Sequence, residues 1–177
     1  MMTRLVPIGS LLLTLALSAG QVRAATPLSM CTSDLLRDFP LLEARAQQGD
    51  GEAQYVVGMA LLQGTCRPSD HARGMALVRQ AALGGHSSAA YFMGNVVTDG
   101  KDGAPPDPMG GAVWRLVGAF FWYNDGVHTA TQFHSIEADV LRGFSEEDKA
   151  TIRWEVVKVL HAIEARQVAA AQAPSKR

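Results

Sequence analysis

The chain has 177 residues, enough for one domain or one short repeat array. Hydrophobic residues make up 47% and charged residues 19%, so the chain can bury a core and is not a disordered tail. Its 16 basic and 17 acidic residues give a net charge of -1, which argues against a nucleic-acid-binding protein.

The first 24 residues have the three parts of a secretory signal peptide. Arg4 supplies the positive start, residues 11–19 form a short apolar run, and Val22 and Ala24 are small residues at the positions that precede a cleavage site. The run is shorter than the roughly 20 apolar residues that span a membrane. We therefore expect cleavage near Ala24, no transmembrane segment in the mature chain, and a periplasmic or secreted protein.

Cys31 and Cys66 are the only two cysteines in the sequence. Export implies an oxidising compartment, where such a pair is expected to form a disulfide. The alternative is two unpaired, buried thiols. A lipid anchor on Cys31 is disfavoured, because Met30 stands where a lipobox needs a small residue. No histidine lies at ligand spacing beside either cysteine, which argues against a metal site.

The body of the chain matches itself at an offset of 36 residues. Small and aromatic residues recur in register: Ala46, Gly49, Ala53, Tyr55, Gly58 and Gly64 return as Ala82, Gly85, Ala89, Tyr91, Gly94 and Gly100. At an offset of 37 residues, Asp70 and Gly74 return as Asp107 and Gly111. Repetition at such a period is typical of stacked helical repeats.

Each repeat unit is predicted to contain two antiparallel helices of about 13 residues, with the turn residues marking their ends. In the first unit, one helix covers 52–63 and ends at Gly64. Its partner begins after Ser69 or Asp70, either of which can cap it, and runs to about Leu83.

The second unit starts with a helix over 87–99 that ends at Gly100. Glycine inside a helix costs about 1 kcal/mol relative to alanine. Because Gly58 and Gly94 occupy the same position in the two units, we expect a facing backbone to pack closely against both.

These residues resemble the Sel-one-like repeat family, a relative of the tetratricopeptide repeats, over about residues 41–122. The resemblance rests on Ala53-Gln54-Tyr55 and on the small residues repeated around them, while Leu77 and Cys66 depart from the usual tryptophan and glycine. It implies an all-α fold: a right-handed α/α solenoid of short antiparallel helix pairs with a long C-terminal capping helix.

The match fades beyond residue 122. Residues 123–142 are expected to form a third first helix, and Ser145 with Asp148 to cap a long last helix. The face of that helix expected to be buried carries Trp154, Val157, Leu160 and His161. An atypical last unit is expected to cap a helical stack.

Four segments follow from these patterns. They are a signal peptide at 1–24, an N-terminal segment tied by the disulfide at 25–40, the repeat solenoid at 41–167 and a flexible tail at 168–177.

Catalytic motifs are weak. Residues 85–89, Gly-His-Ser-Ser-Ala, imitate a nucleophile elbow, but that motif needs a strand before the serine, where a helix is predicted here. The S-x-x-K motif of serine β-lactamases does not occur in the sequence, and the five histidines form neither H-x-x-x-H nor H-E-x-x-H. We expect no enzymatic activity, no metal and no cofactor.

Two apolar features have competing interpretations. The aromatic run at 120–123, Phe-Phe-Trp-Tyr, is either core packing between units, which we favour, or an exposed binding patch. Met59, Met75 and Met93 fit core filling better than a redox site.

Solenoids of this kind bind another protein or peptide on a curved surface. The resemblance implies an adaptor or regulator in the bacterial envelope, with the first helix of each pair on the concave face. That face is expected to carry Tyr55, Met59, Gln63, Tyr91, Asn95, Asp99, His128 and Gln132. The alternatives are tyrosines that only pack between units, an inhibitor or immunity protein, and a cell-wall or β-lactam-directed enzyme. The sequence carries no signal for a particular partner or oligomeric state.

Overall fold

The computed structural model describes residues 31–101, 103–124 and 129–172, and within these ranges the chain is all-α. Its helices are α1 (Ser33–Gln47), α2 (Gly51–Gln63), α3 (His71–Leu83), α4 (Ser87–Asp99), α5 (Pro108–Asn124), α6 (Ala130–Val140) and α7 (Glu146–Gln172). In this part of the chain, no helix is long and apolar enough to cross a membrane. The expected signal peptide and His128 lie outside the described residues.

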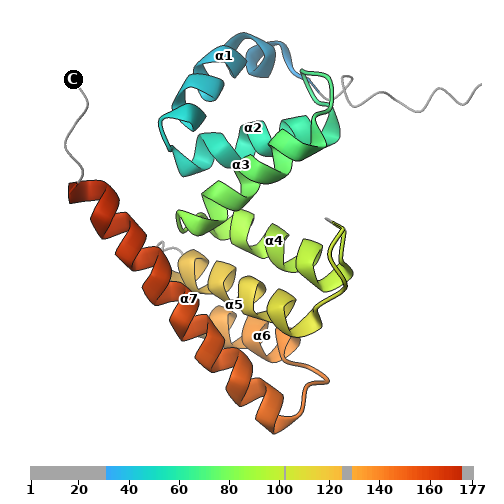
Figure 1. Ribbon diagram of the computed structural model, residues 1–177, viewed down its shortest axis with the longest axis vertical. Coiled ribbons are helices and arrows are strands. Elements are labelled where there is room, and N and C mark those ends of the chain that lie inside the picture. The colour runs from blue at the N-terminus through green and yellow to red at the C-terminus, as the bar shows by residue number, and fades with distance from the viewer. Residues whose placement is uncertain (1–30, 102, 125–128, 173–177) are drawn as a thin grey trace, which may run out of the picture.

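From α1 to α6, helices that follow one another in the chain pack side by side along an elongated molecule (Figure 1). The most extensive contacts join α2 to α3 and α4 to α5, as expected for two-helix units. α5 also contacts α6 and α7. α7 crosses the molecule obliquely toward the turn between α3 and α4, where Gln167 Nε2 donates a hydrogen bond of 2.8 Å to the carbonyl oxygen of Gly84.

The residues at the helix ends explain where α2 and α3 begin and stop. Asp50 and Asp70 are the N-caps, and their carboxylates accept hydrogen bonds from the backbone N–H groups of Ala53 and Arg73. Gly64 ends α2 in the left-handed conformation, with a φ of 68°, a backbone that glycine adopts without a steric penalty. The predicted stop at Gly64 is confirmed, and Asp70 rather than Ser69 caps α3.

Within each of the two helix pairs, the helices touch at glycine residues, as the repeated glycines predicted. A Cβ on Gly58 would lie 3.0 Å from the carbonyl oxygen of Gly74 on α3. A Cβ on Gly94 would lie 2.7 Å from the carbonyl oxygen of Gly111 on α5. Both distances leave no room for a side chain, so the close approach of a facing backbone at Gly58 and Gly94 is confirmed.

This geometry predicts that alanine at Gly94 lowers the free energy of unfolding by about 1–3 kcal/mol, because the added methyl group overpacks a backbone contact that cannot shift. Gly51 is the matched control, since a Cβ there meets nothing closer than 3.7 Å. Urea unfolding of Gly94→Ala and Gly51→Ala should show a loss only in the first. Equal stability of the two variants would contradict the close-packing account.

Two clusters of buried side chains hold the helices together. The smaller one surrounds Phe39 of α1 and includes Val57 and Leu61 of α2. The larger one runs from α3 to α7 and includes Val78, Val117 and other small and branched apolar side chains. The chain therefore buries its apolar surface along its length rather than in one central layer.

The predicted disulfide is confirmed. Cys31 and Cys66 are bonded, with their Cα atoms 5.0 Å apart. The bond joins the residues before α1 to the turn between α2 and α3, next to the buried ring of Phe39. It thus fastens the first helix to the rest of the molecule.

Removing this bond should cost about 4 kcal/mol in the chain-entropy model, which counts the loop that the bond closes. The two cysteines are 35 residues apart in the sequence. We expect the double variant Cys31→Ser, Cys66→Ser to melt well below the oxidised protein, and reductant to lower the melting temperature of the wild type but not that of the variant. An intact mass that is unchanged by reductant would argue against the bond.

The expected buried face of α7 is wrong for Trp154, Val157 and His161, whereas Leu160 does pack against the core. Trp154 is 63% exposed and Val157 is 39% exposed. The buried residues are instead Ile152 and Ile163, with Val156 and Val159 packed beside them. Since successive residues of a helix are about 100° apart, Trp154 points away from the face that holds Ile152. Apolar side chains occur on both faces of α7, so periodicity alone did not identify the buried one.

Several expected boundaries need correction. α7 continues through residue 172, so the expected flexible tail at 168–177 begins inside a helix. Alanines at 169–171 favour helix, and no proline occurs between residues 146 and 173. α1 spans the expected boundary between 40 and 41. The helix expected over 123–142 is shorter: α5 extends to Asn124 and α6 begins only at Ala130.

Candidate functional site

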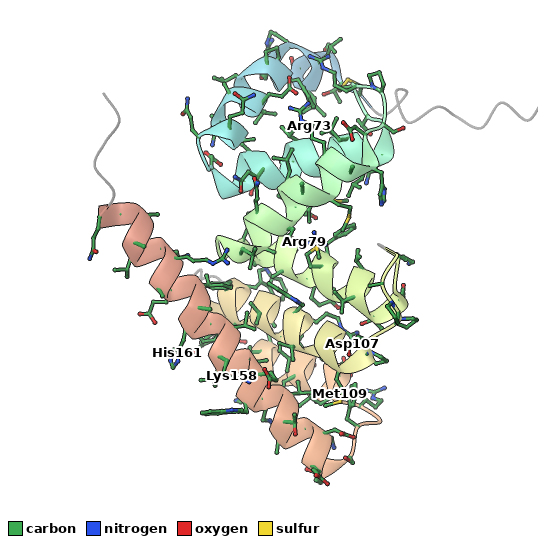
Figure 2. The ribbon with its side chains drawn as sticks, in the orientation of Figure 1. Arg73, Arg79, Asp107, Met109, Lys158 and His161 are labelled. Carbon is green, nitrogen blue, oxygen red and sulfur yellow. A yellow bond between two sulfur atoms is a disulfide. The ribbon has the colours of Figure 1, made fainter. Side chains whose placement is uncertain are left out.

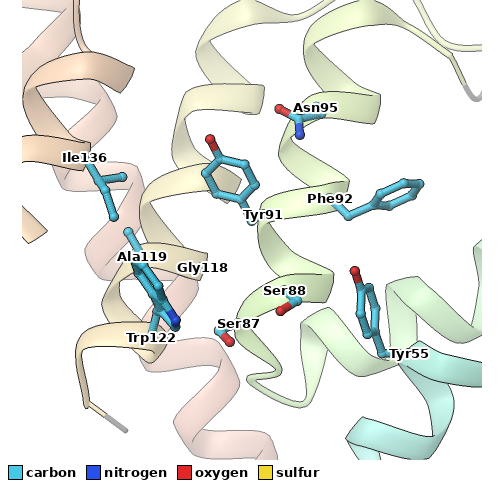
Figure 3. A pocket seen from close by; sticks show the side chains of 10 residues that line it. All are labelled: Tyr55, Ser87, Ser88, Tyr91, Phe92, Asn95, Gly118, Ala119, Trp122 and Ile136. Carbon is cyan, nitrogen blue, oxygen red and sulfur yellow. The ribbon is translucent and has the colours of Figure 1, made fainter. Parts of the chain in front are cut away.

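The main candidate site is an open groove of about 520 Å³ between α2, α4, α5 and α6, which we call the aromatic groove (Figure 3). Most of its lining is apolar, with three tyrosine or tryptophan rings and a few hydroxyl and amide groups. The lining residues are Tyr55, Ser87, Ser88, Tyr91, Phe92, Asn95, Gly118, Ala119, Trp122 and Ile136.

The helical repeat explains why these side chains meet. On α4, Ser88, Tyr91 and Asn95 are three and four residues apart and therefore share one face. On α5, Gly118 faces this part of α4: a Cβ there would lie 2.8 Å from both the carbonyl oxygen of Ser87 and the N–H nitrogen of Tyr91. The missing side chain brings the two backbones together, and the groove lies above this contact.

Exposed aromatic rings form much of the groove. Tyr91 is 43% exposed and Trp122 is 40% exposed, although both are large side chains on well-packed helices. Figure 3 shows their rings on neighbouring helices, with Ile136 of α6 beyond Trp122 and Tyr55 of α2 on the other side of Ser88. Of the aromatic run at 120–123, only Phe121 packs against the core, so the preferred core-packing interpretation is wrong for the other three residues.

A second set of contacts, around His86, holds Tyr55 at the side of the groove. The ring of Tyr55 stacks on that of His86 with their centroids 4.8 Å apart. His86 Nδ1 accepts a hydrogen bond of 3.2 Å from the N–H of Ala89, and so caps α4. His86 Nε2 lies 2.7 Å from a carboxylate oxygen of Glu52. Because Nδ1 accepts, the proton of the neutral ring lies on Nε2 and is donated to Glu52.

Burial raises the pKa of the Tyr55 hydroxyl above its ordinary value, and the nearby charge of Glu52 adds to the effect. Tyr55 is thus a neutral hydrogen-bonding group over the physiological pH range. It can offer an O–H to a bound partner and cannot supply a negative charge.

The geometry does not favour nucleophilic catalysis by Ser87 or Ser88. Activation of a serine needs a general base within hydrogen-bond reach. His86 precedes both serines in the chain, but its two ring nitrogens are engaged by Ala89 and Glu52. Among the described residues, no group of three or more His, Cys, Asp or Glu side chains is arranged to hold a metal ion.

The structure brings together only part of the binding face expected from the sequence. Tyr55, Tyr91 and Asn95 line the aromatic groove. Three other expected residues do not line it: Met59 packs against the core, Gln63 is exposed on α2, and Asp99 pairs with Lys101 at 2.7 Å. Gln132 belongs to the capping box at the start of α6, and His128 lies outside the described residues.

Sequence reasoning missed the residues that complete the groove. Phe92 lies next to Tyr91 on α4, and Trp122 and Ile136 come from α5 and α6. The aromatic run at 120–123 was a signal for Trp122, but it was interpreted as core. Ile136 carries no signal, since its contribution depends on how α6 packs on α5.

No protein-family model matches this sequence, and no curated protein or solved structure matches the chain either. The function must therefore be argued from the geometry described above.

The capping bond of His86 leads to a prediction about stability. His86→Ala removes the side chain that satisfies the N–H of Ala89 and should lower the free energy of unfolding by about 1 kcal/mol. His86→Asn should keep most of that stability, because asparagine is a good N-cap. Urea unfolding measures both. If asparagine proves as destabilising as alanine, the stacking on Tyr55 rather than the cap is the important contact.

Proposed function

We propose that the mature chain is an exported protein–protein interaction module that binds a peptide segment of another protein in the aromatic groove. The observation that carries this proposal is the group of exposed rings, Tyr91 and Trp122 above all, around an apolar hollow. Aromatic side chains are enriched at the centres of protein interfaces, where they bury large areas at a small entropic cost. The proposal includes a role as an adaptor or regulator.

The same proposal covers the finer description of the fold. The two glycine-mediated helix pairs and the repeated Tyr55 and Tyr91 fit a right-handed α/α solenoid of the Sel-one-like kind. In such an array α2, α4 and α6 would line the concave face, and α7 would cap the stack. All three of these first helices contribute to the aromatic groove, which supports this arrangement.

Export to the periplasm or the cell exterior belongs to the proposal as well. The disulfide between Cys31 and Cys66 is compatible with an oxidising compartment. A binding function rather than an enzymatic one is supported by His86, whose ring nitrogens both have partners in the free protein.

The test is a selection of random linear peptides displayed on phage against the oxidised mature protein. Peptides that bind in the aromatic groove should lose about tenfold or more in affinity when Tyr91→Ala or Asn95→Ala is introduced, because the contacts at the centre of an interface dominate its energy. Affinity is measured by calorimetry with the synthetic peptides.

Asp99→Ala is the matched control on the same helix. Asp99 is exposed and does not line the groove, so this variant should bind selected peptides as the wild type does. Melting temperatures of all three variants should stay close to that of the wild type. Selected peptides that bind equally well to Tyr91→Ala would refute the assignment of the groove.

A further inference from the structure

The groove face of α5 carries an arginine that the protein leaves unpaired. The Nε atom of Arg115 is fully buried and has no hydrogen-bond partner among the described residues, and no described carboxylate forms an ion pair with its guanidinium group. Other arginines in this part of the chain do have such partners: Arg45 binds Asp50 and Arg153 binds Glu137. A buried donor without a partner is costly, so its position calls for an explanation.

Arg115 lies at the edge of the aromatic groove. It precedes Gly118 by three residues, Ala119 by four and Trp122 by seven, so all four share one face of α5. Its side chain covers Gly94 of α4: a Cβ on Gly94 would lie 2.5 Å from the Arg115 Cγ. Arg115 is therefore next to the part of α4 that presents Asn95 to the groove.

The carboxylates nearest to this region in the sequence are engaged elsewhere. Asp99, one turn after Asn95 on α4, pairs with Lys101 at 2.7 Å. Glu137, the residue after Ile136 on α6, pairs with Arg153 at 2.8 Å. The charge of Arg115 thus stays available at the side of an otherwise apolar groove.

We propose that Arg115 binds the carboxylate of an acidic side chain in the peptide that occupies the aromatic groove. The proposal rests on the function proposed above and adds a specific charge to it. Guanidinium and carboxylate groups can form two parallel hydrogen bonds, and a partly buried pair of this kind is stronger than an exposed one. An aspartate or glutamate of the partner would pair with the guanidinium charge, for which the described part of the free protein supplies no carboxylate.

The position of the arginine indicates where the acidic residue would lie. Arg115 lies on α5 beside α4, at the edge of the groove, and is not one of its lining residues. Tyr55 and Phe92 lie toward α2, while Trp122 and Ile136 lie toward α6 (Figure 3). The acidic residue is therefore expected beside the apolar residues of the bound segment that fill the groove.

Figure 2 shows how many charged and polar side chains surround the helices, so the test must separate Arg115 from the general charge of the surface. Selected peptides should contain Asp or Glu, and its replacement by Asn or Gln should weaken binding to the wild type by about tenfold. With Arg115→Gln the same replacement should change the affinity by less than about twofold, because the partner charge has gone. Arg166→Gln, which removes an exposed charge on α7, is the control and should behave as the wild type.

Arg115→Lys guards against a variant that merely fails to fold. It keeps the charge but not the planar fork, so it should retain only part of the acid-to-amide effect. Binding to the wild type should also weaken as salt is added, and binding to Arg115→Gln should weaken less.

The outcomes are distinguishable. Peptides that need Tyr91 but contain no acidic residue would overturn the role of Arg115 and leave the proposed function standing. An acid-to-amide effect of equal size in the wild type and in Arg115→Gln would overturn it too. If no selected peptide depends on Tyr91, the proposed function and this inference fail together.

Discussion

Close contact between helix backbones is the constraint on which the rest of this structure depends. Gly94 of α4 faces Gly111 of α5, and a side chain at either position would collide with the carbonyl oxygen of the other helix. Gly58 and Gly74 do the same for α2 and α3. Each glycine costs helix propensity, and the packing of two whole helices offsets that cost. The same contact, repeated along the chain, sets how the helices lie beside one another.

The packing of α5 against its neighbours creates the aromatic groove. It contacts α4, α6 and α7, and a third glycine, Gly118, lets it approach the first turn of α4. Because the backbones meet there, the longer side chains on either side cannot fill the space between the helices. Tyr91 and Trp122 therefore lie beside an open groove instead of inside a core.

The chemistry of the groove depends on which of the side chains around it already have hydrogen-bond partners. The ring of His86 stacks on Tyr55, and its two nitrogens are hydrogen-bonded to Ala89 and Glu52. The ring is therefore part of the framework rather than a reactive group. Arg115 is the opposite case, since its Nε finds no partner in the described part of the chain. The proposed recognition of a peptide rests on these exposed apolar rings.

The sequence alone determined the helical units, their glycine stops, the close glycine contacts and the pairing of Cys31 with Cys66, because each depends on local rules or on composition. It also singled out Tyr55, Tyr91 and Asn95, since residues three to four apart share a helix face. Only the tertiary structure decided which face of α7 is buried, because Trp154 and Ile152 lie on different faces of that helix and both faces carry apolar side chains. Likewise, Trp122 and Ile136 come together through the packing of α6 on α5, and Arg115 meets Gly94 through the packing of α4 on α5. Contacts between distant segments leave no periodic trace in the sequence.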